Sequence, residues 1–225
     1  MTLRGPLEAV VFDLDGVIVD SESAWDSARR AVVAEAGGRW REHATRAMMG
    51  MSAPEWARYL QNELAVDLPT EEIDERVVTH LLGSYADTLP LLPGAAHAVR
   101  ELAGAWPLAL ASAANRRVID FVLARGGLAS YFTATVSAEE VGAGKPAPDV
   151  YLAAAARLGV DPSRAAAVED SSSGLRSAAA AGMAVVAVPN RAFPPDEDAL
   201  ALADLTVGSL TELSAELLAS KFGAR

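Results

Sequence analysis

Four short groups of polar residues each come after an apolar run, and their side chains could act together. They are Asp13-Leu14-Asp15-Gly16, Ser112-Ala113-Ala114-Asn115, Gly144-Lys145-Pro146 and Glu169-Asp170-Ser171. The groups supply carboxylates, a hydroxyl, flexible or exposed backbone amides and a lysine. Such a set suits phosphoryl transfer with a divalent metal ion. Oxygen ligands without a His or Cys cluster favour Mg²⁺ over zinc.

The spacing within the first and fourth groups fits a shared site. Asp13 and Asp15 are two residues apart, so an extended backbone would place both carboxylates on one side. Gly16 would let the chain turn close to a ligand. Glu169 and Asp170 are adjacent, so both can face one site only if the strand has already given way to a loop. A metal ion would also allow these four crowded carboxylates to stay ionised.

Apolar runs that are too short for helices predict the strands that position these groups. The expected strands cover residues 9–12, 107–111, 132–136, 165–168 and 184–188, with 205–207 as a candidate sixth. Helical periodicity fills the gaps, and two of the helices are closed by Gly159 and Gly182. Strands that alternate with helices predict an α/β fold with a parallel sheet and right-handed crossovers. Ligands bind beyond the carboxyl ends of such strands, so the four polar groups are expected to converge there.

One stretch, from about residue 21 to residue 86, shows three helical patterns and no strand pattern. Their apolar faces consist of Trp25, Ala28, Val32 and Ala36, then Trp56, Leu60 and Leu64, then Ile73, Val77 and Leu81. The second pattern begins with the capping-box sequence Ser52-Ala53-Pro54-Glu55. We therefore predict an α/β core formed by residues 1–20 and 87–225 and an all-helical inserted domain at residues 21–86.

The composition limits the kinds of partner. The chain has 225 residues, 51% of them apolar and 22% charged, which is typical of a globular protein. Its net charge of −11 argues against binding to nucleic acids or anionic membranes. The absence of cysteine excludes disulfides and Cys-ligated metal sites. Without a membrane-length apolar stretch or a signal-peptide pattern, the protein is expected to be cytoplasmic. The polar groups above predict a small phosphorylated metabolite as its partner, and we expect a monomer or weak dimer.

Taken together and in this order, the four polar groups resemble the four motifs of the haloacid dehalogenase superfamily. Asp13-Leu14-Asp15-Gly16-Val17 resembles the first motif, Ser112 the second, Lys145 the third and Glu169-Asp170 the fourth. The helical insert resembles the small cap of the family's phosphatases and of sugar mutases similar to β-phosphoglucomutase. The resemblance covers residues 10–188 and implies a Rossmann-like, doubly wound parallel sheet with an inserted helical cap.

The resemblance also implies catalytic and metal-binding roles. Asp13 would be the nucleophile that forms an aspartyl-phosphate, and Asp15 would be the general acid and then the general base. Mg²⁺ would be held by the Asp13 carboxylate, the Asp15 backbone carbonyl and Asp170. Glu169 would bind the metal directly or through water, and both alternatives stay open.

Other residues would hold the substrate. Ser112, Lys145 and the backbone amides near Ala113 would bind the transferring phosphoryl oxygens, where fixed positive charge stabilises the transition state. Only Lys145 and Lys221 are lysines among the 19 basic residues, which favours a fixed role for Lys145. The residues expected to contact the substrate are Gly16, Trp25, Gly50, Ala113 and Asn115.

Departures from the family's patterns favour hydrolysis of a phosphomonoester. Dehalogenases need neither a metal nor Asp15, and phosphonatases need a cap lysine, whereas residues 1–144 contain none. The sugar mutases have a His where this chain has Trp25 and an Arg where it has Ala53. We therefore expect a Mg²⁺-dependent phosphatase, with hexose or hexitol phosphates as candidate substrates. A phosphomutase similar to β-phosphoglucomutase is the alternative.

Two alternatives from other classes are also considered. A signalling receiver domain phosphorylates an aspartate beside Mg²⁺, but it is shorter, has no helical insert and carries its acidic pair on the first strand. The second acidic pair after Lys145 disfavours that assignment. A binding protein that has lost catalysis is the other alternative, although every catalytic position is present.

Overall fold

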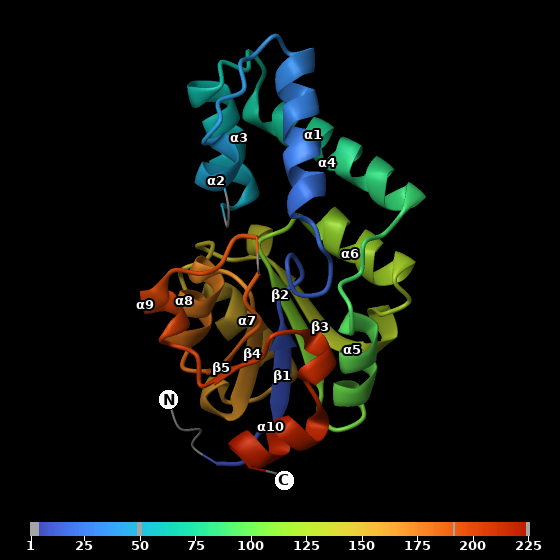
Figure 1. Cartoon of the computed structure of the whole chain (residues 1–225), viewed down its shortest axis with the longest axis vertical. Coiled ribbons are helices and arrows are strands. Elements are labelled where there is room, and N and C mark those ends of the chain that lie inside the picture. The colour runs from blue at the N-terminus through green and yellow to red at the C-terminus, as the bar shows by residue number, and fades with distance from the viewer. Residues whose placement is uncertain (1–4, 49–50, 191, 224–225) are drawn as a thin grey trace.

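The computed structural model describes residues 5–48, 51–190 and 192–223. In chain order the strands and α-helices are β1 (Ala9–Phe12), α1 (Glu22–Glu35), α2 (Ala44–Met48), α3 (Ala53–Glu63), α4 (Thr70–Asp87), α5 (Ala95–Ala103), β2 (Leu108–Ser112), α6 (Arg116–Arg125), β3 (Phe132–Ser137), α7 (Asp149–Leu158), β4 (Ala165–Glu169), α8 (Ser172–Ala180), β5 (Ala184–Ala187), α9 (Glu197–Leu200), β6 (Leu205–Thr206) and α10 (Ala215–Phe222). Short 3₁₀ turns are η1 (Ala129–Tyr131), η2 (Ala138–Glu140), η3 (Pro162–Arg164) and η4 (Leu210–Glu212). Figure 1 shows α1 to α4 gathered at one end of the molecule, beyond the sheet. None of the described helices has the length and apolarity needed to cross a bilayer.

Strands β1 to β6, which are the strands of the described residues, form one parallel sheet in the order β3-β2-β1-β4-β5-β6. Strand β1 lies in the middle, with Phe12 aligned to Leu110 of β2 and to Val168 of β4. The strand order reverses beside β1, and such a reversal leaves a crevice at the carboxyl edge of the sheet. The α/β fold with a doubly wound parallel sheet is thereby confirmed.

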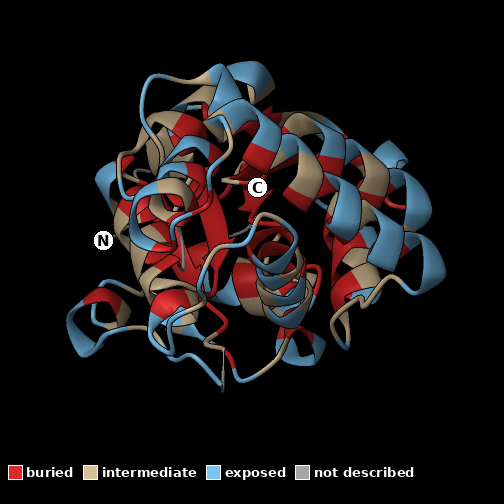
Figure 2. Ribbon diagram, turned by 90° about the horizontal axis from the view of Figure 1, so that it is seen from above, coloured by how far each residue is buried: buried red, intermediate tan, exposed pale blue. Residues whose placement is uncertain are grey.

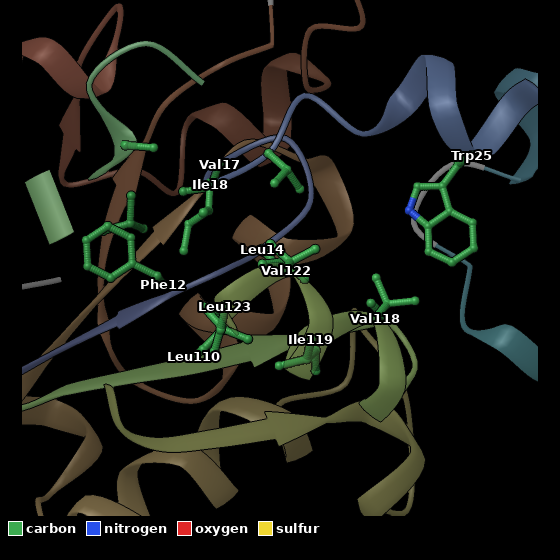
Figure 3. Packing of buried hydrophobic residues seen from close by; sticks show 14 of the residues in the cluster. Phe12, Leu14, Val17, Ile18, Trp25, Leu110, Val118, Ile119, Val122 and Leu123 are labelled. Atoms are coloured by element: carbon green, nitrogen blue, oxygen red, sulfur yellow. The ribbon is translucent and has the colours of Figure 1, made fainter. Parts of the chain in front are cut away.

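Helices cover both faces of the sheet, which explains why β1, β2, β4 and β5 are buried along their whole length. On one face, Phe12 and Leu110 share a core with Val122 of α6 (Figure 3). On the other face, Val11 shares a core with Tyr151 of α7. Seen from above, buried residues gather on the inner sides of the helices and exposed residues on the outer sides (Figure 2).

The insert is helical, as the periodicity predicts. Helix α4 packs against α1 and α3. The capping box at the start of α3 is present, and in it the Ser52 backbone N–H donates to the Glu55 carboxylate (2.7 Å). Helix α2 was not predicted, and α4 continues to Asp87, one residue past the expected boundary. The two chain segments that connect the insert to the core run side by side, because the Asp20 N–H donates to the Pro90 carbonyl (2.8 Å). The division into separate domains stays a prediction.

Candidate active site

A pocket of about 650 Å³ lies where the carboxyl ends of the strands face the inserted helices. Asp13, Lys145 and Asp170 line it from the sheet side, and Trp25 and Arg29 line it from helix α1. Polar residues from segments far apart in the sequence therefore meet in one cavity, at the edge where the sheet topology predicts a ligand.

Asp13 lies at the centre of the sheet side of this pocket. Its backbone N–H donates to the Val168 carbonyl (3.0 Å), so the end of β1 is fixed against β4. Its Oδ1 is 2.8 Å from Lys145 Nζ, and both side chains are less than 10% exposed. Burial raises the pKa of Asp13 to about 8, even though the Lys145 ammonium acts in the opposite direction. A nearby cation would favour the ionised carboxylate that a nucleophile requires.

Lys145 is held by two carboxylates and by a tyrosine ring. Its Nζ lies 2.5 Å from Glu169 Oε1 as well as close to Asp13, and 5.0 Å from the centre of the Tyr151 ring. Burial favours the neutral amine, but Asp13 and Glu169 keep the pKa of Lys145 above its ordinary value. The lysine is therefore a fixed positive charge beside Asp13.

Glu169 is fully buried, and protein donors occupy both of its carboxylate oxygens. Lys145 and the Tyr151 hydroxyl (2.7 Å) donate to Oε1. The Asp170 N–H (3.1 Å) and the Ser171 hydroxyl (3.2 Å) donate to Oε2. The carboxylate also lies against the backbone of Gly174, where an added Cβ would come within 1.9 Å of it. These contacts make Glu169 an organiser of the site, with little capacity left for a further ligand.

A group of carboxylates at this point fits a divalent cation. Among the described residues, Asp13, Glu169 and Asp170 each place a carboxylate oxygen within 4.8 Å of the others, and all three are buried. Burial, together with Glu169 and Asp13, raises the pKa of Asp170 well above its ordinary value. One lysine cannot balance three carboxylates, whereas an additional divalent cation would stabilise their ionised forms. The donor set therefore suits Mg²⁺.

Gly16 leaves room for the Asp170 carboxylate of this cluster. Its φ of +74° is a conformation that glycine adopts readily, and a Cβ there would lie 1.9 Å from Asp170 Oδ2. The contact of Gly16 with the substrate stays a prediction, and the structure shows that the Asp170 carboxylate occupies the space beside the Gly16 Cα. Gly16 lines a neighbouring cavity.

Asp15 faces the inserted helices. The indole Nε1 of Trp25, in the first turn of α1, donates to Asp15 Oδ1 (2.9 Å). A side chain of the insert thus touches directly the residue expected to be the general acid. The sequence predicts that Trp25 is near the substrate, but not this hydrogen bond.

Replacing Trp25 by Phe should lower kcat/KM for a sugar phosphate by about tenfold, because Asp15 loses a hydrogen bond that orients its carboxyl group. The measurement is steady-state hydrolysis by the variant and by a matched control, Trp56→Phe. Trp56 packs against Trp25 with ring centres 6.1 Å apart and the rings tilted by 55°, but among the described residues it has no hydrogen bond to Asp15. Equal losses of kcat/KM in the two variants would show that Trp25 contributes to activity through packing and not through its hydrogen bond to Asp15.

The loop after β2 is fixed by hydrogen bonds to its own residues and to neighbouring segments. Ser112 Oγ accepts from the Ala114 N–H (3.0 Å) and is fully buried. The Asn115 amide donates to Asp74 of α4 (3.0 Å) and to Glu139 (2.8 Å). This loop therefore connects the sheet to the inserted helices.

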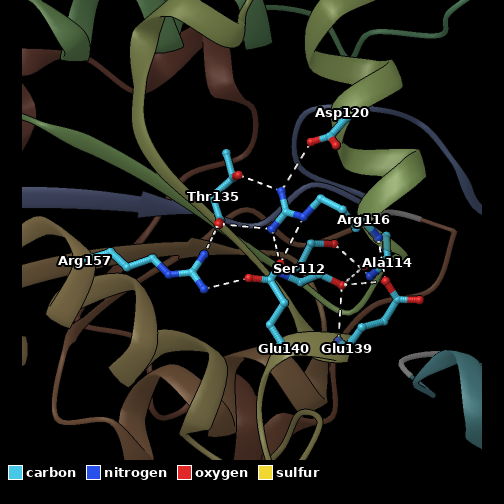
Figure 4. A network of polar contacts seen from close by, with 9 residues as sticks. Ser112, Ala114, Arg116, Asp120, Thr135, Glu139, Glu140 and Arg157 are labelled. Atoms are coloured by element: carbon cyan, nitrogen blue, oxygen red, sulfur yellow. Dashed lines mark hydrogen bonds and ion pairs between the residues drawn. The ribbon is translucent and has the colours of Figure 1, made fainter.

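Beneath this loop, Arg116 and Glu140 form the polar network of Figure 4. The Arg116 guanidinium also donates to the Thr135 hydroxyl (2.7 Å), and Arg157 donates to Glu140 (2.6 Å). Burial opposes ionisation of Glu140, but the two arginines lower its pKa to about 2. The network keeps the start of α6 in place under the pocket.

Most residues predicted for the site are brought together. Those that line the pocket are Asp13, Asp15, Trp25, Ala113, Asn115, Lys145 and Asp170. Ser112 and Glu169 lie directly beneath it, and Gly50 lies outside the described residues. Sequence reasoning missed Tyr151 and Arg29. Arg29 could have been found, since it lies four positions after Trp25 and therefore on the same helical face.

Comparisons with known proteins agree with this geometry. A family model described as haloacid dehalogenase-like hydrolase matches residues 7–182. Hexitol phosphatase B of Escherichia coli K12 is 36% identical over 220 residues, covering 92% of this chain and 95% of that protein. Fructose-1-phosphate phosphatase of the same organism is 34% identical over 185 residues, covering 80% of this chain and 95% of its own length.

The fold also matches solved structures. The structure of CbbY from Rhodobacter sphaeroides in complex with phosphate superposes with a TM-score of 0.83 at 28% identity. The match covers 92% of this chain and 96% of that one. The similarity includes the inserted helices as well as the sheet, because it extends over nearly the whole chain.

Proposed function

The chain belongs to the haloacid dehalogenase-like hydrolases, and from that membership we propose how its residues carry out its reaction. It is a phosphatase, an enzyme that hydrolyses phosphomonoesters. The observation that carries the residue assignments is the meeting of Asp13, Lys145 and Asp170 with Asp15 in one buried pocket. The roles below follow from their contacts.

Asp13 is the nucleophile. One of its carboxylate oxygens attacks phosphorus, and the bond between phosphorus and the leaving-group oxygen breaks, which gives an aspartyl-phosphate and an alcohol. Asp15 donates a proton to the departing oxygen. In the second step a water molecule gives its proton to Asp15 and attacks phosphorus, which releases inorganic phosphate and restores Asp13.

The phosphoryl oxygens are held by groups fixed before the substrate arrives. Lys145 Nζ is 2.8 Å from Asp13 Oδ1 and supplies positive charge next to the reacting atom. Ala113, in the loop after β2, lines the same pocket, and its backbone amide would bind a phosphoryl oxygen there together with Ser112, which is buried at the start of this loop. Glu169 keeps Lys145 in place by accepting its hydrogen bond, and the Tyr151 hydroxyl in turn donates to Glu169.

Mg²⁺ would be held by the Asp13 and Asp170 carboxylates and by the Asp15 backbone carbonyl. When bound, it reduces the repulsion between an anionic nucleophile and an anionic substrate. Glu169 acts indirectly, since protein donors already engage both of its oxygens.

The substrate is a small phosphomonoester with a sugar-like leaving group, and hexose and hexitol phosphates are the first candidates. The names of the two relatives support this class. Trp25 and Met51 give the pocket apolar surface next to its charged residues. Such a mixed lining suits a sugar or polyol, which has both C–H and hydroxyl groups. Residues 21–86 act as a cap domain that admits the substrate, and the paired segments near Asp20 and Pro90 act as its hinge.

The function is tested by steady-state hydrolysis of a panel of sugar, polyol and small-acid phosphates, together with p-nitrophenyl phosphate. We expect turnover that requires Mg²⁺, stops on addition of a chelator and returns with excess Mg²⁺. An added bisphosphate in the same panel tests the phosphomutase alternative, which predicts isomerisation in place of phosphate release. Absence of sustained turnover of p-nitrophenyl phosphate would contradict a phosphatase and favour a receiver or a binding protein.

A further inference from the structure

Arg29 is a buried cation in the part of the pocket that the inserted helices form. It lies on α1, one turn after Trp25, and is 8% exposed. Its guanidinium carbon is 5.1 Å from the centre of the Trp25 ring and 5.3 Å from that of Trp56. The guanidinium thus lies against two aromatic rings and borders the same cavity as Asp15.

The guanidinium of Arg29 finds no hydrogen-bond acceptor in the part of the chain that the structure describes. Within residues 5–48, 51–190 and 192–223, it forms no ion pair and donates no hydrogen bond, and its Nε is buried without a partner. The next residue, Arg30, also lies on a tryptophan ring, that of Trp40, but it is exposed and pairs with Asp26 (2.5 Å). The contrast shows that α1 can provide partners for an arginine, and that Arg29 has no hydrogen-bond or ion-pair partner among the described residues.

An unpaired buried charge is unfavourable. We therefore expect the guanidinium of Arg29 to bind an anionic partner. Burial lowers the pKa of Arg29 to about 10, although Glu22, Asp15 and Asp26 act in the opposite direction. The side chain therefore stays protonated at neutral pH. None of these carboxylates forms an ion pair with it in the described structure.

We propose that Arg29 binds a carboxylate at the far end of the leaving group, so that the preferred substrates are phosphomonoesters of sugar acids or similar hydroxy acids. The planar guanidinium matches a carboxylate with two parallel hydrogen bonds and is neutralised by its charge. A hydroxyl group could accept one of these hydrogen bonds but would bring no opposite charge to the guanidinium. This inference rests on the proposed function and specifies its substrate class.

The position of Arg29 sets where the carboxylate must lie. The ester oxygen of the substrate has to reach Asp15, and the Trp25 ring stands between Asp15 and Arg29 through its contacts with both. The acid group is therefore several bonds away from the phosphorylated oxygen. Arg46 also borders the pocket and adds positive charge, whereas Glu22 restricts an anionic group to the side nearer Arg29.

The test compares two substrates that differ at one carbon. D-Gluconate 6-phosphate carries a carboxylate where D-glucitol 6-phosphate carries a hydroxymethyl group. We expect the wild-type kcat/KM to be about tenfold or more higher for the acid. Replacing Arg29 by Met keeps the contact with the tryptophan rings and removes the charge, and it should reduce the acid-to-alcohol ratio by about 10- to 100-fold.

Two further variants make the result specific. Arg30→Met removes a neighbouring charge on the same helix and should leave the ratio unchanged, because Arg30 lies outside the pocket. Arg29→Lys keeps the charge without the planar fork and should restore part of the preference for the acid. If Arg29→Met does not fold, the acid-to-alcohol ratio of kcat/KM in the wild type and in Arg29→Lys still tests whether Arg29 binds the carboxylate.

The outcomes separate the inference from the function on which it rests. Equal wild-type kcat/KM values for the two compounds, or a parallel loss on both in Arg29→Met, would overturn the inference and leave a phosphatase in place. No turnover of any phosphomonoester, including p-nitrophenyl phosphate, would contradict the function and the inference together.

Discussion

Replacing Asp13 by Asn is expected to abolish turnover, with a fall in kcat of about 10⁴-fold or more. The amide is neutral and cannot form the aspartyl-phosphate, so both steps of the proposed reaction are lost. The fold should remain, because the substitution removes a carboxylate whose burial already opposes its charge, and Lys145 keeps its ion pair with Glu169. The measurement is hydrolysis of p-nitrophenyl phosphate in excess Mg²⁺, with thermal unfolding recorded on the same sample.

A matched control separates this effect from a general loss of acidic charge. Asp120→Asn changes an exposed carboxylate on α6, outside the pocket, and should retain wild-type kcat within about twofold. Appreciable turnover by Asp13→Asn in a well-folded sample would refute the assignment of the nucleophile.

Replacing Asp15 by Asn is expected to have the second largest effect and to depend on the leaving group. For a sugar phosphate, whose alkoxide is a poor leaving group, kcat/KM should fall by about 10²- to 10⁴-fold. For p-nitrophenyl phosphate, whose phenolate needs little protonation, the fall in kcat/KM should be much smaller. The ratio kcat/KM is the appropriate quantity, because it reports the phosphorylation step and not the later attack of water.

Asp20→Asn is the control for this variant, since Asp20 is exposed and lies in the same loop without bordering the main pocket. It should leave the dependence on the leaving group unchanged. Equal losses of kcat/KM on the two substrates in Asp15→Asn would count against a general acid at this position.

The strands and the four polar groups could be predicted because their signal is local. Strands β1, β2 and β4 are apolar runs that end in or lead directly into a polar residue, and parallel strands bring those ends to one edge. The errors at the strand ends have physical causes. Pro107 was predicted in a strand, but it has no N–H to donate, and β2 begins at Leu108 although the Pro107 carbonyl accepts from Val10 (3.2 Å).

Other features could not be predicted because they depend on contacts between distant segments. Helix α2 has five residues, too few to show a helical period. The partners of Glu169 come from α7 and from the loop that carries Lys145, so the sequence left open whether Glu169 binds a metal directly. The isolation of Arg29 is also a property of the folded chain, since it depends on which carboxylates fail to reach the guanidinium.

The hydrogen bond between Trp25 and Asp15 could be predicted from the sequence only in part. The sequence pattern places Trp25 on the insert and near the substrate, which agrees with its position in the pocket. Its partner is ten residues earlier, across a turn whose path no periodicity describes. The contact joins the insert to the residue proposed as the general acid, so we expect docking of the proposed cap and protonation of the leaving group to be linked.

The most direct measurement is the identification of the phosphorylated residue in a single turnover. Asp15→Asn should accumulate the intermediate, because it retains the nucleophile and lacks the base that activates water. After mixing with p-nitrophenyl phosphate and Mg²⁺ and quenching in acid, mass spectrometry should find one phosphoryl group on the peptide that contains Asp13. Hydroxylamine should remove it, as expected for an acyl phosphate. A phosphoryl group on another residue, or none while p-nitrophenol is released in a burst, would contradict covalent catalysis by Asp13.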